Sequence, residues 1–141
     1  MLVDANLLLY AVNEDDPRSA RAGEWLTEQL NGNRRVGLPW QSLGAFLRIS
    51  THPRAWPRPL KAATACSLVA DWLAAPAAWV PNPEGLHGTI LTALITRHGL
   101  TGNLIPDAML AALAIEHGLT ICSADSDFAR FDEVTWMNPV A

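Results

Sequence analysis

Four aspartates occupy positions in the sequence where a reactive site can form. Asp4 ends a short apolar segment at the start of the chain, and Asp125 and Asp127 follow a second apolar segment near its end. Asp107 opens a strongly apolar stretch with helical spacing. In an open parallel sheet, ligands bind beyond the carboxyl ends of the strands. Asp4 and Asp125 are predicted at that edge, and Asp107 reaches it if its helix starts on the same side.

The property that these residues share is negative charge in one place. Carboxylates in one cleft repel each other, which costs stability unless a cation neutralises them. Hard oxygen ligands without accompanying His or Cys suit Mg²⁺ or Mn²⁺ rather than zinc. Such a metal can activate a water molecule and stabilise the transition state of phosphodiester hydrolysis. The predicted chemistry is therefore metal-assisted hydrolysis without a covalent nucleophile.

Each aspartate also has a structural interpretation to be weighed. Asp107 follows a proline at a helix start, where an acid commonly caps the helix. Asp125 and Asp127 stand two residues apart in a loop, where turn formation is a sufficient reason for them. Asp4 gains no obvious structural role from its position. Asn6 is expected to support Asp4 through a hydrogen bond or to cap the following helix, rather than to bind the metal.

The basic residues form a segment of their own. The net charge of −4 argues mildly against a protein that coats nucleic acid. Residues 34–61, however, contain no acid and six basic residues, namely Arg34, Arg35, Arg48, Arg54, Arg58 and Lys61. Beside a metal site this segment can grip a phosphate backbone, although it can equally be an ordinary solvated loop. The candidates for RNA contact are Arg48, Arg54, Arg58, Lys61 and, as a ring that stacks on a base, Trp56.

Length and composition limit the remaining possibilities. A chain of 141 residues suffices for one compact domain, which we place at 1–141. No apolar stretch approaches the roughly 20 residues of a membrane span, and the N-terminus does not resemble a signal peptide. Cys66 and Cys122 are both expected to be small buried thiols in a reducing, cytoplasmic setting. The tryptophans other than Trp56 are assigned to the core, and His87 is assigned to a helix surface.

Short apolar runs alternate with longer segments of helical periodicity. Strands are expected at residues 1–3, 36–38, 79–80, 119–122 and 134–137. Helices are expected at 17–30, 40–50, 60–75, 86–98 and 106–117, the first with Asp16 as its N-cap. Alternating strands and helices imply crossover connections and a parallel sheet. The predicted fold is a three-layer α/β/α sandwich with a short, mostly parallel central sheet.

Four segments of the chain resemble the VapC toxins, which are ribonucleases of the PIN-domain class. In chain order they are residues 4–11 (DANLLLYA), 102–108 (GNLIPDA) with the apolar helix that follows, 123–131 (SADSDFARF) and 136–139 (WMNP). One such motif is a weak signal, whereas four in the right order and spacing are a specific one. Together they cover essentially the whole chain.

The resemblance implies a PIN fold and the toxin of a type II toxin–antitoxin pair, a Mg²⁺- or Mn²⁺-dependent endoribonuclease that cuts tRNA or ribosomal RNA. Its implied partners are a cognate VapB antitoxin, the RNA substrate and a second copy in a homodimer, with no membrane. Asp4, Asp107 and Asp125 carry over as the metal-binding acids. Asp127 would be an auxiliary acid and Ser123 a supporting hydroxyl.

One position departs from the family pattern. The family carries a further acid, usually Glu, either directly after a Trp, where this chain has Gln41, or one turn later, where it has Ala45. The two positions share a helix face, so either would point at the cleft. Two interpretations stay open: a ribonuclease weakened by Gln41 at a catalytic position, or an impaired module that binds RNA or antitoxin without cutting.

Two other protein classes also place acids at strand ends. A response-regulator receiver needs a lysine after its last strand, but the only lysine here is Lys61. A phosphatase of the haloacid-dehalogenase type needs a second Asp two residues after the first, and this chain has Asn6 there. Both classes are excluded.

Overall fold

A five-stranded sheet forms the middle layer of the computed structural model, which describes all of residues 1–141. Its strands are β1 (Leu2–Val3), β2 (Val36–Gly37), β3 (Ala78–Trp79), β4 (Ile121–Cys122) and β5 (Trp136–Met137). They are ordered β3-β2-β1-β4-β5, and every neighbouring pair is parallel. The chain builds outward from β1 to β3 and then returns to β4 on the other side. The strand order therefore reverses between β1 and β4, where open parallel sheets leave a crevice.

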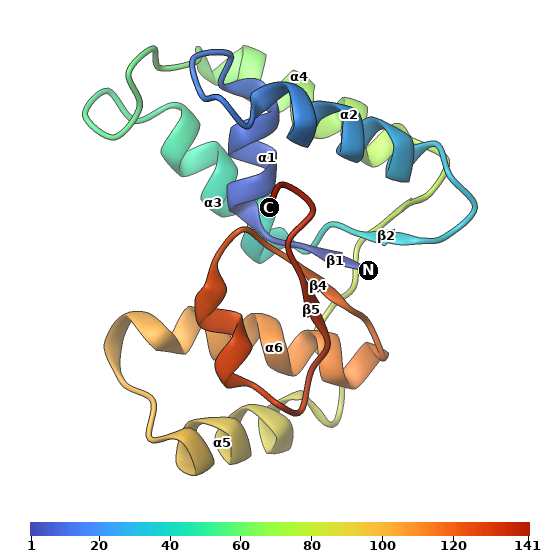
Figure 1. Ribbon diagram of the computed structural model, residues 1–141, viewed down its shortest axis with the longest axis vertical. Coiled ribbons are helices and arrows are strands. Elements are labelled where there is room, and N and C mark those ends of the chain that lie inside the picture. Colours follow the sequence, from blue (N-terminus) through green and yellow to red (C-terminus); the bar gives the residue numbers. More distant parts are fainter.

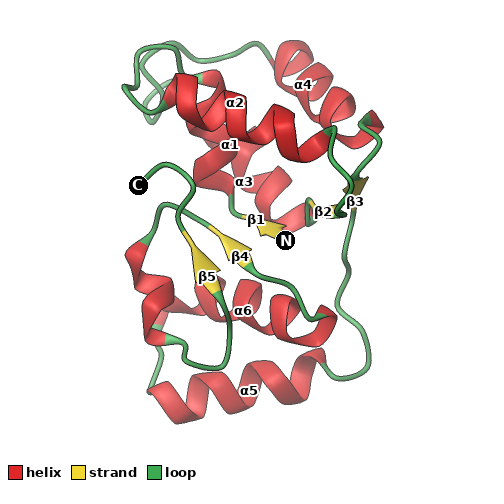
Figure 2. Ribbon diagram, turned by 45° about the vertical axis from the view of Figure 1, so that its right-hand side comes forward, coloured by secondary structure: helices red, strands yellow, loops and turns green.

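Helices cover both faces of the sheet (Figure 1). One layer holds α1 (Ala5–Val12), α2 (Ser19–Leu30), α3 (Trp40–Ser50) and α4 (Ala62–Ala74). The other holds α5 (His87–His98) and α6 (Ile105–His117), with 3₁₀ turns η1 (Gly102–Leu104) and η2 (Ser126–Arg130). Figure 2 shows the sheet between these layers. The predicted three-layer α/β/α sandwich is confirmed, and the sheet is parallel throughout. None of the helices has the length and apolar character needed to cross a membrane.

The central strands β1 and β4 contribute to both apolar cores because successive side chains point to opposite faces. Val3 and Cys122 belong to the core under α1 to α4. Leu2 and Ile121 belong to the core against α5 and α6. All four side chains are fully buried. A parallel sheet covered on both faces requires such continuous apolar strands, and this is why the short runs of the sequence mark the strands correctly.

The starts of α1 and α2 depart furthest from the sequence prediction. For α1 no bounds were predicted, only a helix after Asn6. It begins directly after β1 because the carboxylate of Asp4 accepts the N–H of Ala5 at 2.8 Å and caps the helix. α2 begins at Ser19, so the placement of Asp16 as its N-cap was wrong. The Asp16 carboxylate instead accepts the N–H of Arg18 and pairs with the guanidinium of the same residue, both at 2.8 Å, which fixes a turn ahead of the helix.

Three burial predictions were also wrong. Cys66 is exposed, because the buried positions of α4 are Ala65 and Val69; Cys122 is buried as expected. Trp40 keeps 53% of its surface exposed at the start of α3. The side chain of His87 is only 13% exposed, since it sits at the start of α5 near the carboxylate of Glu116.

Ser42 connects α3 to the end of β1. Its buried hydroxyl donates to the carbonyl oxygen of Val3 at 2.7 Å. Ser42→Ala removes this partner from a buried carbonyl, and we expect the free energy of unfolding to fall by about 1–2 kcal/mol. Urea denaturation measures the change. Ser67→Ala, which alters an exposed serine of α4, is the control and should change stability by less than about 0.5 kcal/mol. Equal effects of the two variants would contradict this role of Ser42.

Candidate active site

A cavity of about 480 Å³ opens between α3 and α6 at the carboxyl edge of the sheet. Its lining residues are Asp4, Ala5, Gln41, Ser42, Gly44, Ala45, Arg48, Pro106, Asp107 and Leu110. Several of these residues belong to the first turns of α1, α3 and α6. Helix N-termini carry partial positive charge, which favours carboxylates nearby. The N-termini of three helices therefore border a cavity that contains the carboxylates of Asp4 and Asp107.

Four aspartates gather at this edge. Carboxylate oxygens of Asp107, Asp125 and Asp127 all lie within 4.8 Å of one another. Asp4 lines the same cavity as Asp107 and raises the pKa of Asp107, and the charge of Asp125 in turn raises the pKa of Asp4. The structure therefore brings together the four acids that the sequence placed after strands or at a helix start.

The carboxylate of Asp4 is fixed from two sides. Besides the N–H of Ala5, it accepts the hydroxyl of Ser123 at 2.7 Å. Asn6 donates to both Asp4 and Ser123, at 3.3 and 3.0 Å, and its side-chain oxygen accepts the N–H of Ala124 at 3.2 Å. These bonds join the end of β1 to the loop after β4. Asn6 therefore supports Asp4, and α1 is capped by Asp4 instead.

The other acids differ in whether they have a structural role. Asp125 accepts the N–H of Asp127 at 2.9 Å and caps η2, so turn formation accounts for part of its position. Asp107 lies in the first turn of α6 but makes no capping hydrogen bond. The helix-cap interpretation of Asp107 is therefore wrong, because no capping hydrogen bond accounts for the position of its carboxylate.

The charges of this cluster disturb one another. Burial raises the pKa of Asp107 to about 6, assisted by the negative charges of Asp125, Asp4 and Asp127 and opposed by Arg130. Burial also raises the pKa of Asp4, although the hydrogen bonds from Ser123 and Ala5 oppose this rise. The site thus holds its carboxylates at an electrostatic cost that a bound cation would remove.

The cluster fits a divalent cation. Carboxylate oxygens are ligands that hard cations prefer, at about 2.0–2.6 Å, so two ligands on opposite sides of one ion lie about 4–5 Å apart. The oxygens of Asp107, Asp125 and Asp127 are already within 4.8 Å of each other. This cluster of three aspartates contains no His or Cys. The residues present are those of an oxygen-ligated metal centre.

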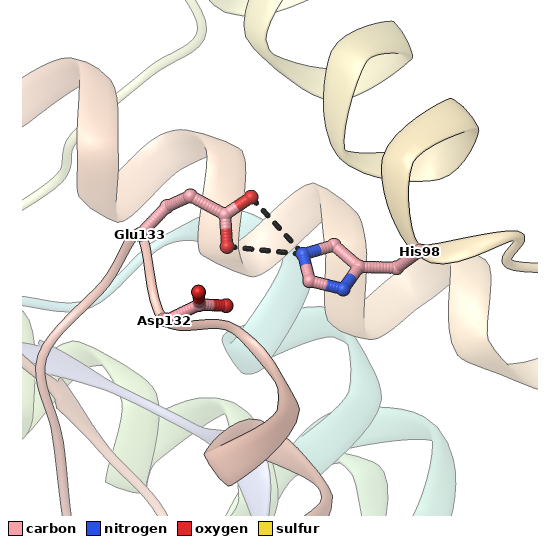
Figure 3. Close-up of side chains that lie close together, drawn as sticks. All are labelled: His98, Asp132 and Glu133. Carbon is pink, nitrogen blue, oxygen red and sulfur yellow. Dashed lines mark hydrogen bonds and ion pairs between the residues drawn. The ribbon is translucent and has the colours of Figure 1, made fainter.

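A second group of possible ligands lies at the end of α5 (Figure 3). Nε2 of His98 faces both carboxylate oxygens of Glu133 at 3.0 Å, with Asp132 beside them. The guanidinium of Arg97 lies 3.1 Å from Asp132 and 3.3 Å from Glu133. This arginine already pairs with both acids, so the group is an ion-pair network that ties α5 to the segment after η2.

The side chain of Gln41 reaches from α3 to α6. Its side-chain amide donates to the carbonyl oxygen of Pro106 at 2.7 Å and so joins α3 to α6. Ala45 lines the cavity as well, one turn later. Both positions expected to carry the family's further acid therefore point at the site, and in this chain neither supplies a charge.

The basic segment does not form one surface. Arg48 lines the cavity. Arg58 pairs with Asp15 at 2.7 Å, and with Trp56 it borders a separate hollow of about 240 Å³. Trp56 also packs against the first core. Arg54 and Lys61 are exposed and line neither space. Of the predicted RNA contacts, only Arg48 lies at the acidic cavity.

The sequence analysis overlooked Arg130 as a member of the site. Its Nη2 lies 3.5 Å from the carboxylate of Asp127, and its Nε donates to the carbonyl oxygen of Asp127 at 3.1 Å. It is the one basic residue whose charge lowers the pKa of Asp107. The spacing of three residues in a helical turn is the signal that could have identified this pair.

The chain is similar to known proteins over nearly its whole length. The sequence matches the PIN domain family over residues 1–134. It is 48% identical to Ribonuclease VapC37 of Mycobacterium tuberculosis over 140 residues, which cover 99% of this chain and 97% of that protein.

Solved structures share the fold at low sequence identity. The crystal structure of VapC20 of Mycobacterium tuberculosis, described as a sarcin-ricin loop cleaving toxin, superimposes with a TM-score of 0.69 at 19% identity and covers 95% of this chain and 98% of that chain. VapBC2 of Rickettsia felis, solved with a DNA fragment from its promoter, gives a TM-score of 0.67 at 17% identity, covering 97% and 96%.

The raised pKa of Asp107 makes a prediction about stability. A carboxyl whose pKa rises on folding, here to about 6, favours folding when protonated and opposes it when ionised. Asp107→Asn should therefore stabilise the metal-free protein at pH 8 by roughly 1–2 kcal/mol, after allowance for solvent screening. The advantage should shrink as the pH falls through 6 and vanish near pH 4.

Urea denaturation in EDTA at several pH values measures this effect. Asp71→Asn, which changes an exposed aspartate of α4, is the matched control and should give no such gain. Equal free energies of unfolding for the parent chain and Asp107→Asn at pH 8 would show that the ionised carboxylate of Asp107 does not destabilise the fold.

Proposed function

The chain belongs to the VapC ribonucleases of the PIN-domain family, and we propose that it is the toxin of a type II toxin–antitoxin pair that hydrolyses RNA at the cavity between α3 and α6. The observation that carries this proposal is the convergence of Asp107, Asp125 and Asp127 within 4.8 Å, beside Asp4. This cluster has the ligand chemistry for metal-assisted phosphodiester hydrolysis.

We assign Mg²⁺ or Mn²⁺ to this cluster, with Asp4, Asp107 and Asp125 as its protein ligands and Asp127 as an auxiliary acid. The all-oxygen donor set favours these ions over zinc. When bound, the ion would activate a water molecule and neutralise charge that develops on the phosphate.

The surrounding residues have separate tasks in this proposal. Ser123 and Asn6 hold the carboxylate of Asp4 in place through the bonds that join β1 to the loop after β4. Arg130 and Arg48 place positive charge on either side of the acids, where an RNA phosphate can be held. The cluster alone would repel RNA, so these arginines support binding of the substrate.

The partners follow from the family. We propose a cognate VapB antitoxin, because VapBC2 of Rickettsia felis is such a toxin–antitoxin complex. The substrate class is structured RNA, tRNA or ribosomal RNA; VapC20, which shares the fold, is described as cleaving the sarcin-ricin loop. A homodimer is the proposed assembly of the toxin.

A second candidate function rests on Gln41. Its amide is bonded to Pro106, and α3 supplies no acid to the cavity. A chain with this site can bind RNA or antitoxin and cut slowly or not at all. Loss of a general acid–base group typically lowers a rate by about 10²–10⁴-fold.

The central prediction concerns Asp107. Asp107→Asn should abolish RNA cleavage, since it removes a metal ligand, while the fold stays intact because Asp107 makes no capping bond. Cleavage of total cellular RNA with Mn²⁺, followed by mapping of the cut ends, measures the activity. Parallel reactions with Ca²⁺ and with Asp71→Asn are the controls. A folded Asp107→Asn variant that cuts like the parent would contradict the proposed site.

Gln41→Glu tests the departure from the family. A carboxylate cannot donate to the carbonyl of Pro106, so the new side chain is released toward the acids, where it adds a ligand or a proton acceptor. Cleavage should rise by at least about tenfold, a cautious floor below the usual contribution of such a group.

The measurement is a time course at fixed Mn²⁺ with Asp107→Asn as blank. Gln29→Glu on α2, far from the cavity lining, controls for added charge. Ala45→Glu places the acid one turn later on the same face and tests the family's other arrangement. Equal rates for the parent, Gln41→Glu and Ala45→Glu would show that α3 does not contribute an acid to the reaction.

A further inference from the structure

A ridge of three residues on α3 is not explained by the acidic cluster. Trp40, Gly44 and Arg48 are spaced four residues apart and therefore lie along one side of the helix, over about 12 Å. Gly44 and Arg48 line the cavity, and Trp40 stands one turn ahead of Gly44. Gly44 and Arg48 thus belong to the α3 wall of the cavity, and Trp40 continues the same side of the helix beyond the cavity lining.

Gly44 has no structural reason to be glycine. It lies inside α3, where glycine is less favourable than alanine because it has more backbone freedom to lose on folding. Its φ is not positive, and a Cβ added there would meet no atom within 4 Å. The missing side chain leaves a hollow in the cavity wall, with the helix backbone open to a ligand.

Trp40 stands outside both apolar cores. The residue keeps 53% of its surface exposed. The other five tryptophans are partly buried: four pack against a core, and Trp79 packs against Arg35 and His117. A tryptophan that keeps about half of its surface in water forgoes part of the burial that stabilises most tryptophans, and its exposed surface is available to a ligand.

Arg48 supplies an available positive charge at the other end of the ridge. Its side chain is exposed, and the ion pairs of the structure involve other residues. Helical side chains lean toward the N-terminus, so Arg48 leans back toward the hollow at Gly44. Arginine pairs well with phosphate through two parallel hydrogen bonds.

We propose that Trp40, Gly44 and Arg48 form a nucleotide-binding subsite for single-stranded RNA, in which a base stacks on Trp40 beside the hollow at Gly44 and Arg48 pairs with an adjoining phosphate. This subsite rests on the proposed ribonuclease function, because it would hold RNA next to the acidic cluster. Stacking on an aromatic ring tolerates any base, so the subsite positions the strand and leaves sequence choice to other contacts.

RNA fits this ridge better than a protein partner does. An aromatic face, a hollow and a cation in a row match the base, sugar and phosphate of one nucleotide. The ridge is also continuous with a cavity whose lining carries Asp4 and Asp107, where the scissile phosphate would lie. A protein-binding helix face would instead present several exposed apolar side chains, and α3 has only Trp40 of that kind.

The first test is RNA binding measured apart from cleavage. The probe is a fluorescein-labelled single-stranded RNA of mixed sequence, and the readout is its anisotropy in Ca²⁺. Trp40→Ala should weaken binding by about 5- to 100-fold, as expected for a lost stacking contact. Trp40→Phe should keep most of the affinity, whereas Trp40→Leu should behave like Trp40→Ala. Similar Kd values for the Phe and Leu variants would overturn the stacking role.

The glycine gives a second signature that a structural role does not predict. Gly44→Ala should raise Tm by about 2–4 °C and yet weaken RNA binding, because the methyl group enters the hollow. Gly88→Ala on α5 is the matched control, since a Cβ there also meets no atom within 4 Å. It should raise Tm without changing the Kd for RNA. Unchanged RNA binding by Gly44→Ala would overturn the hollow.

Salt dependence separates the arginine from the ring. Arg48→Gln should lower the slope of log Kd against log salt by about one unit, whereas Trp40→Ala should leave it unchanged. If the parent binds RNA and all three positions can be changed without effect, the subsite is wrong and the proposed function stands. If the parent binds no RNA, both fail. If Trp40→Ala alters only the sedimentation of the chain, Trp40 is a protein contact and the subsite is overturned.

Discussion

Mutual repulsion among four aspartates is the constraint on which the rest of the site depends. The strand order places β1 beside β4, so Asp4 and the loop with Asp125 and Asp127 meet at one edge. α6 then adds Asp107. Burial and the charges of the other three aspartates raise the pKa of Asp107 to about 6. The fold tolerates this cost because Ser123 and Asn6 fix Asp4 and because Arg130 offsets part of the charge. A bound divalent cation would offset the remainder and would thereby couple the stability of the site to the proposed chemistry.

The walls of the cavity follow from the same arrangement. α3 follows β2, the strand beside β1. The hydrogen bond from Ser42 to Val3 ties α3 to β1, and the hydrogen bond from Gln41 to Pro106 ties it to α6. Because α3 brings no acid, the metal chemistry depends on the other elements. Arg48 gives this wall a positive charge. In our proposal, the acids therefore carry the reaction and α3 contributes to binding of the RNA.

Most of the fold was predictable from the sequence, because apolar strands covered on both faces and amphipathic helices leave strong local patterns. The bounds of α3 agree with the prediction, while the start of α1 was missed because Asp4 ends a strand and caps a helix at once. The gathering of the acids was predictable from their positions after strands. The dispersal of the basic segment was not: Arg58 pairs with Asp15 because two loops far apart in the sequence meet. The exposure of Trp40 likewise depends on tertiary packing, which periodicity does not reveal.

The central claim is that the aspartates at the carboxyl edge of β1 and β4 form a divalent metal site. Anomalous diffraction from crystals soaked in Mn²⁺ tests it most directly, because the chain offers a second group of possible ligands as an internal comparison. Our account predicts a peak bounded by Asp4, Asp107 and Asp125, with carboxylate oxygens about 2.0–2.3 Å from the ion. It predicts no peak at His98, Asp132 and Glu133, where Arg97 already pairs with both acids. A peak at that second group alone, or none at the aspartates, would contradict the account.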